Sequence, residues 1–206
     1  MAGEIPRLDQ QKQLKIAKSQ SEILREQFEK LPEADRSIFQ NGSLFLALNA
    51  SLCSLIANGM LRQVLNITEA RIAASLPVVV LPFISTVAVF ESYVNLPLMN
   101  GELNCATCAW MRGSLIGAVI GCLYPAFLTF PLNGALAARY STTPLPSKEN
   151  ALRYWVNISK PIFRKMRIPA ILQAAFGAYL GSKNHETYIK MLRVSGFGRR
   201  SEELSE

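Results

Sequence analysis

Long stretches without a charged residue constrain this chain more than any other feature of its sequence. Three of them are apolar throughout and cover residues 41–61, 72–90 and 113–138. An α-helix rises about 1.5 Å per residue, so about 20 residues cross the ~30 Å hydrocarbon layer of a membrane. Each stretch is therefore long enough to span it. Only 18% of the chain is charged, against about 25% in soluble proteins, which excludes an ordinary soluble globule.

A fourth charge-free stretch covers only residues 168–182. Apolar residues before it add length, because Arg164, Lys165 and Arg167 could extend their charged ends to the membrane surface. We expect a fourth span here, with a short re-entrant or interfacial segment as the alternative. The stretches lack the alternation of polar and apolar residues that indicates a barrel strand, which leaves helices. The predicted fold is an all-α integral membrane protein, a bundle of about four transmembrane helices over about 41–61, 72–90, 113–132 and 163–182.

The two ends of the chain are polar. We expect an amphipathic amino-terminal segment (1–40), a membrane domain (41–182) and a polar tail (183–206). Leu24, Phe28 and Leu31 recur at the spacing of one helix face, which predicts a helix that ends before Pro32. Acidic residues close to the start argue against a cleavable mitochondrial leader, so targeting information would lie in an internal membrane segment.

Glycines recur at every fourth residue in two of the apolar stretches. They are Gly113, Gly117 and Gly121 in the third stretch, and Gly177 and Gly181 in the fourth. Glycines four residues apart lie on one helix face and allow another backbone to approach closely. The pattern predicts close helix packing, either between these two helices, which is the more ordinary case, or between each helix and a partner.

Cys105 and Cys108 form a Cys-x-x-Cys pair in the connection before the third long stretch. A zinc site would need two further ligands, but the other two cysteines lie in apolar stretches and the single histidine, His185, lies near the end of the chain. We therefore expect no metal. The pair predicts a structural disulfide or two free thiols rather than a redox catalyst, because no cation lies at a defined spacing to stabilise a thiolate.

The net charge of +7 is concentrated between the third and fourth stretches. The basic residues of this predicted loop are Arg139, Lys148, Arg153, Lys160, Arg164, Lys165 and Arg167. With Tyr154 and Trp155 beside them, they are typical of a segment at the membrane interface. We expect the loop to contact anionic lipid head groups or an acidic protein surface. Nucleic acid is not an expected partner, because no nucleic-acid-binding fold is recognisable.

The sequence contains no recognisable catalytic arrangement. A lone histidine in a polar tail cannot assemble a serine-histidine-acid triad, and no nucleotide-binding glycine motif occurs. The charge-free stretches hold no ionisable residue, which argues against an ion-coupled transporter. Prolines inside three of them predict kinks: Pro77, Pro82, Pro125, Pro131 and Pro169. We expect neither an enzyme nor a cofactor; the alternative is a small transporter or lipid-handling protein of an organelle membrane, with proline-broken helices around a cavity.

Three blocks of the sequence resemble the transmembrane protein 126 family. They are residues 31–77, 112–140 (RGSLIGAVIGCLYPAFLTFPLNGALAARY) and 159–182, which are most similar to the A-type branch, while 82–87 and 144–155 are also similar to the B-type branch. The resemblance implies a multi-pass protein of the mitochondrial inner membrane that assists assembly of respiratory complex I and catalyses no reaction. The implied partners are membrane-arm subunits of complex I and other assembly factors.

Overall fold

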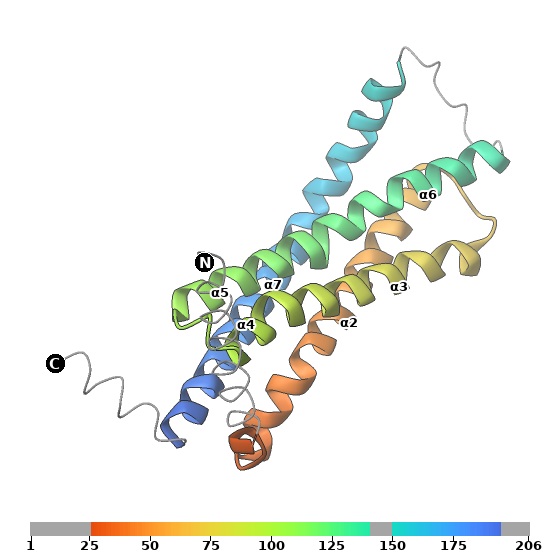
Figure 1. Cartoon of the computed structure of the whole chain (residues 1–206). Helices are drawn as coiled ribbons and strands as arrows, with labels where there is room; N and C mark the ends of the chain where they lie inside the picture. The colour runs from red at the N-terminus through yellow and green to blue at the C-terminus, as the bar shows by residue number, and fades with distance from the viewer. Residues whose placement is uncertain (1–25, 141–149, 195–206) are drawn as a thin grey trace, which may run out of the picture.

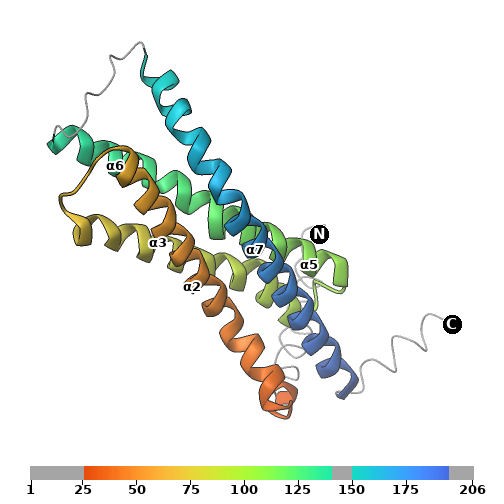
Figure 2. The same cartoon turned by 180° about the vertical axis from the view of Figure 1, so that it is seen from behind.

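The computed structural model describes residues 26–140 and 150–194, and every regular element within them is helical. The elements form four long rods: α2 (Glu33–Val64); α3 (Arg71–Phe90) with η1 (Glu91–Asn95) and α4 (Leu96–Met99); α5 (Ala106–Leu115) with η2 (Ile116–Leu123) and α6 (Tyr124–Tyr140); and α7 (Ala151–Val194). Successive rods run in opposite directions (Figure 1), and α7 lies against α2 on the side seen in Figure 2.

Three helices in the described part of the chain are long and apolar enough to cross a membrane. They are Glu33–Val64, Ala74–Met99 and Ala106–Tyr140. The first and third contain the predicted spans 41–61 and 113–132, and the second covers all but the first two residues of the predicted span 72–90. The fourth predicted span lies inside α7, which does not meet the same requirement because basic and polar residues flank its short charge-free stretch. The predicted count of about four spanning helices is therefore not confirmed, whereas the all-helical architecture holds for the described residues.

Helices extend into both of the predicted polar ends of the chain. Residues 26–29 are helical and the chain turns before Pro32, but the rest of the predicted amphipathic helix lies outside the described residues. The first membrane helix already begins at Glu33. At the other end α7 continues to Val194, and Tyr188 and Met191 are almost fully buried. The first part of the predicted polar tail is therefore a packed helix.

Two apolar clusters hold the rods together. One lies at the end where α2 begins and includes Phe39 of α2 and Tyr188 of α7. The other lies toward the opposite end and joins Leu61 of α2, Ala126 of α6 and Met166 of α7. Since α7 contributes to both clusters, it packs against the other rods along most of its length.

Prolines lie within the helices without interrupting them. Two lie in α3 (Pro77 and Pro82) and two in α7 (Pro161 and Pro169). Pro82 has no N–H to donate to the carbonyl of Val78, four residues earlier. The hydroxyl of Ser54 on α2 donates to this carbonyl instead, at 2.5 Å. A neighbouring helix thus satisfies a backbone group that could not be left unpaired in an apolar interior.

Pro97 at the start of α4 is a similar case. It has no N–H to donate to the carbonyl of Tyr93, four residues earlier, and the π-helical segment η1 precedes it. Arg112 of α5 donates its Nη1 to that carbonyl at 3.2 Å. The described helices therefore continue through these prolines. A cavity lined by broken helices would require the helices to be interrupted there.

Candidate functional site: a glycine-lined helix pair and a basic end of the bundle

The two glycine sets lie against each other where α5 and η2 pack on α7. A side chain on Gly113 would collide with the carbonyl oxygen of Gly177, and a side chain on Gly177 would collide with that of Gly113. Gly181 lies in the same way against the carbonyl of Ala109. Since no Cβ fits at these positions, the two helix backbones touch directly, and the glycine face of one helix covers that of the other. The structure thus brings the predicted residues together within the chain.

Gln173 completes this contact in the middle of the bundle. Its carbonyl oxygen lies against Gly117, and its side chain covers Gly121. The side-chain Nε2 donates to the carbonyl oxygen of Leu46 on α2 at 2.8 Å, and the residue is only 2% exposed. One side chain therefore joins α7 to both η2 and α2. The only signal for it in the sequence is a lone amide within an apolar stretch.

Buried asparagines bond in pairs between the rods. Asn133 of α6 donates to Asn58 of α2 at 2.7 Å. Asn184 of α7 donates to Asn95 of η1 at 2.6 Å. From the sequence, Asn49, Asn58 and Asn133 are candidates for a helix contact or a substrate contact. The structure pairs Asn58 with Asn133, whereas the buried Nδ2 of Asn49 has no hydrogen-bond partner among the described residues. The paired amides thus lie between helices, where such side chains link helices in membranes.

Glu91 lies inside the continuous candidate span Ala74–Met99. The charge-free stretch ends at Phe90, but the helix continues to Met99, so the candidate span is longer than predicted and includes this carboxylate. Each carboxylate oxygen of Glu91 accepts one hydrogen bond: from Ser43 of α2 at 2.6 Å, and from Asn95 one turn later at 2.9 Å. Glu91 is half-buried, and these bonds tie η1 to the early part of α2.

Cys105 and Cys108 lie at the start of α5 as exposed free thiols. Cys105 is the N-cap of the helix, and its sulfur accepts a hydrogen bond from the N–H of Cys108 at 3.4 Å. Hydrogen bonds from the thiol and the N–H of Cys108 lower the pKa of Cys105. At this capping position, hydrogen bonds and not a neighbouring cation stabilise the thiolate of Cys105. Within residues 26–140 and 150–194, no group of three or more His, Cys, Asp or Glu could hold a metal.

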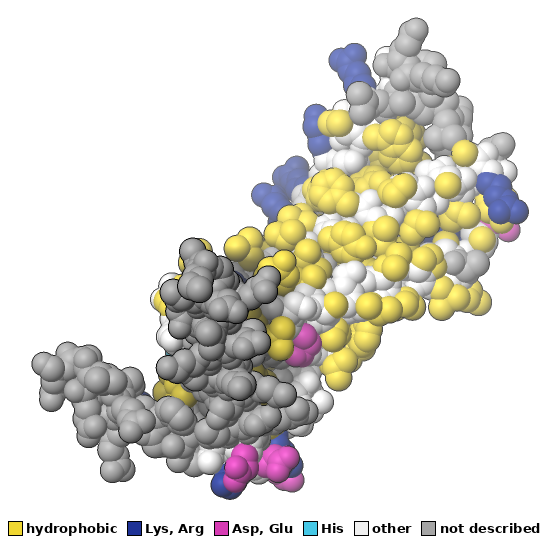
Figure 3. All heavy atoms as spheres, viewed as in Figure 1, with side chains coloured by type: hydrophobic (Ala, Val, Ile, Leu, Met, Phe, Trp, Pro, Cys, Tyr) yellow, Lys and Arg dark blue, Asp and Glu magenta, His cyan; other side chains and the backbone are white. Residues whose placement is uncertain are grey.

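The predicted basic loop is largely helical. Arg139 lies near the end of α6, Lys148 lies outside the described residues, and Arg153, Lys160, Arg164, Lys165 and Arg167 are exposed side chains of α7. All of these α7 residues except Lys165 fall on one face at helical spacing. The opposite face packs Ile162 and Met166 into the core, which is why this segment is a helix. Lys and Arg side chains gather along this end of the molecule (Figure 3).

Comparison with known proteins places these features in a family context. The family described as Transmembrane protein 126 matches residues 18–196. The chain is 51% identical to Transmembrane protein 126A of Homo sapiens over 169 residues, which covers 82% of this chain and 87% of that protein. It is 30% identical to Complex I assembly factor TMEM126B, mitochondrial, of Rattus norvegicus over 161 residues, covering 78% of this chain and 69% of that protein. No solved structure matches the chain significantly.

Proposed function

Because the chain belongs to the transmembrane protein 126 family, we propose that it is a non-enzymatic assembly factor for respiratory complex I in the mitochondrial inner membrane. The observation that carries this proposal is the 30% identity, over 78% of the chain, to a relative that is named a mitochondrial complex I assembly factor. Its partners are membrane-arm subunits of complex I and other assembly factors.

The surface of the bundle supports a role in binding apolar helices. Large apolar side chains are exposed on the outward faces of all four rods, for example Phe45 of α2, Ile84 of α3, Phe127 of α6 and Ile171 of α7. Hydrophobic side chains cover much of the middle of the face shown in Figure 3. In a membrane such a surface contacts lipid or the helices of another protein. A membrane-arm subunit that has not yet met its own neighbours presents the matching apolar surface.

We further propose that α7 crosses the membrane as a fourth span. Gly177 contacts Gly113 and Gln173 bonds to Leu46, and both partners belong to candidate spans, so this part of α7 lies at the same depth as they do. Arg167 precedes and Lys183 follows the charge-free stretch. Their long side chains can extend toward the two membrane surfaces, which allows a short apolar stretch to cross.

Loss of the protein tests the assembly function. We expect cells without it to contain less complete complex I and to accumulate incomplete membrane-arm intermediates, as resolved on native gels with complexome profiling. Re-expression of the protein should restore the complex. Unchanged complex I with an altered metabolite or lipid flux would contradict the proposal and support a transporter or lipid-handling protein instead.

A further inference from the structure

Arg62 places a buried guanidinium group with an unsatisfied nitrogen near the end of α2. The residue is only 8% exposed. Its Nη2 donates to the carbonyl oxygen of Glu69 at 2.5 Å, whereas its buried Nη1 has no acceptor among the described residues. Burial of a charged donor without an acceptor is costly. An anionic ligand at Nη1 would remove that cost.

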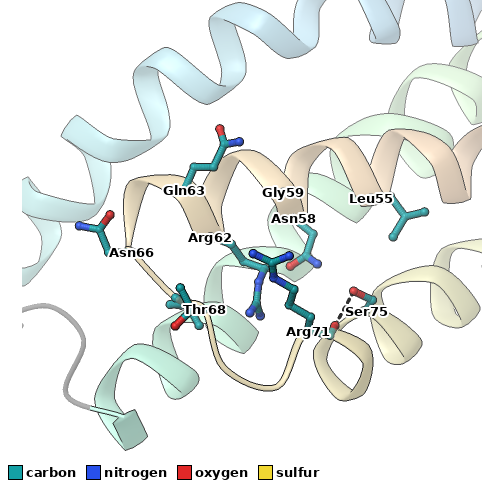
Figure 4. Close-up of a pocket in the computed structure, with 10 residues that line it drawn as sticks. Leu55, Asn58, Gly59, Arg62, Gln63, Asn66, Thr68, Arg71 and Ser75 are labelled. Atoms are coloured by element: carbon teal, nitrogen blue, oxygen red, sulfur yellow. Dashed lines mark hydrogen bonds between the residues drawn. The ribbon is translucent and has the colours of Figure 1, made fainter.

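Arg62 lines a pocket of about 530 Å³ between α2 and α3 (Figure 4). Arg71 lies beside it, near enough for the two positive charges to repel each other. Thr68 and Ser75 add hydroxyl groups to the wall. Neither arginine forms an ion pair within the described part of the chain, and the carboxylate of Glu69 accepts a hydrogen bond from Thr68. The pocket therefore concentrates positive charge.

The start of α3 adds to this positive potential. The 20-residue helix begins at Arg71 without a side-chain cap, after Ala70 in the left-handed conformation. The first N–H groups of a helix have no partner within it, and its amino end carries a partial positive charge that attracts anions. Arg71 and Ser75 both line the pocket, so this end of the helix faces it.

An apolar groove continues from the pocket along α3. Arg71 and Ser75 line both, and Ile72, Leu76 and Val79 complete a groove of about 310 Å³. Ile72 is 81% exposed and Leu76 60% exposed. A charged pocket that opens into an apolar groove suits a ligand with a phosphate group and a hydrocarbon chain.

The position of the pocket along the bundle suits a lipid of the surrounding membrane. Arg62 ends the charge-free stretch 41–61, so the pocket lies where head groups meet the hydrocarbon layer. The basic face of α7 lies toward the same end of the bundle, because Ile162 and Met166 on its other side pack with Leu61. Clustered basic residues at this level attract anionic lipids.

We propose that the pocket between α2 and α3 binds the phosphate group of an anionic phospholipid, with Arg62 and Arg71 as its donors and one acyl chain in the groove along α3. Guanidinium groups suit this role because they donate two parallel hydrogen bonds to one phosphate. A turn of the Arg62 side chain brings Nη1, which protein atoms enclose here, to the phosphate as its missing acceptor. The phosphate also relieves the repulsion between the two arginines.

Native mass spectrometry of the full chain, purified in detergent, tests the proposal with phosphatidylglycerol as the probe. We expect one tightly retained lipid, and an affinity lowered about tenfold or more by Arg71→Gln, the loss expected for a charge-assisted hydrogen bond. Arg71 is exposed, so its replacement should leave the melting temperature unchanged. Arg62→Gln should lower the affinity at least as much.

Arg193→Gln is the matched control, because it removes the same charge from an exposed position near the opposite end of α7. It should leave lipid retention unchanged. Equal losses for Arg71→Gln and Arg193→Gln would overturn the proposal, since they would indicate a general charge effect. Equally tight retention of phosphatidylcholine, which has no net charge, or equally tight binding of inorganic phosphate without acyl chains, would also overturn it.

Discussion

Ser54 supplies, with its hydroxyl group, a hydrogen bond that Pro82 removes from the backbone of α3. Ser54→Ala should therefore leave the carbonyl of Val78 unpaired in the interior and destabilise the protein by about 1 kcal/mol, as expected for such a bond between membrane helices. The measurement is the thermal unfolding of the purified protein in detergent. Ser85→Ala is the control, because Ser85 bonds back to Leu81 within its own helix and should have little effect.

The proline itself provides a sharper check of this explanation. Pro82→Ala restores a backbone N–H that can bond to the carbonyl of Val78. In the Ser54→Ala background it should therefore recover most of the lost stability. If Ser54→Ala remains equally destabilised with and without Pro82, the hydroxyl does not act by replacing the missing backbone bond.

Cys105 should be the more reactive thiol of the Cys-x-x-Cys pair. Its pKa is lowered by hydrogen bonds from Cys108, so more of it is thiolate below the ordinary thiol pKa, and the advantage shrinks as rising pH ionises both groups. We expect faster alkylation of Cys105 than of Cys108 by iodoacetamide near neutral pH, measured by peptide mass spectrometry. Equal rates across the pH range would contradict the capping role of the sulfur.

At the scale of helices, the glycine faces allow a simple comparison. Gly117→Ile places a branched side chain against the carbonyl of Gln173, so η2 and α7 must separate, at a cost of about 1–3 kcal/mol or more. We expect a variant that still inserts into the membrane but is degraded faster or migrates differently on native gels. Carbonate extraction and a turnover assay measure the two effects.

Val119→Ile is the matched change, because Val119 is already branched, lies off the glycine face and is 40% exposed. It should behave like the unmodified protein in the same assays. Identical behaviour of Gly117→Ile and Val119→Ile would show that the glycines do not carry the contact between η2 and α7.

Cysteine labelling tests whether α7 crosses the membrane. In a chain with Cys105→Ser and Cys108→Ser, we expect the single variants Arg153→Cys and Arg193→Cys to react with a membrane-impermeant maleimide from opposite sides. The replaced residues are exposed and lie near the two ends of the helix. Labelling of both from the same side would support the re-entrant alternative and exclude a fourth span.

The helices differ in how well the sequence predicts them. Three helices are predicted well, because the stretches 41–61, 72–90 and 113–138 are each long and apolar enough to cross a membrane. The long α7 is harder to predict, because the many basic residues from Arg153 to Arg167 are typical of a loop. In the structure Ile162 and Met166, which lie between them in sequence, pack into the core. The basic residues are exposed on one face of α7, and the opposite face packs against the core of the bundle.

The contacts between helices are the part that the sequence does not predict. Spacing identifies a glycine face on each of two helices, but not that Gly113 meets Gly177. Gln173 and Glu91 bond to groups far away in sequence, Leu46 and Ser43, so their roles depend on which rods the fold places side by side. Local patterns carry no information about such distant pairs.

At the scale of the whole molecule, the described residues form a helical bundle with apolar outer faces and a basic end. The chain belongs to the transmembrane protein 126 family, and it is 30% identical to a relative named as a complex I assembly factor. The bundle would hold apolar helices of a partner on its outer faces while its glycine-lined interior keeps α5, η2 and α7 together. We therefore expect the bundle to bind complex I subunits.

Quantitative co-purification tests that claim most directly. The tagged protein is isolated from mitochondria solubilised in a mild detergent, beside a tagged inner-membrane protein of similar abundance, and the bound proteins are measured by mass spectrometry. We expect membrane-arm subunits of complex I and other assembly factors to be enriched several-fold over the control, and the Val119→Ile variant to retain them. Complex I subunits at the level of the control, with the protein intact and inserted, would contradict this expectation.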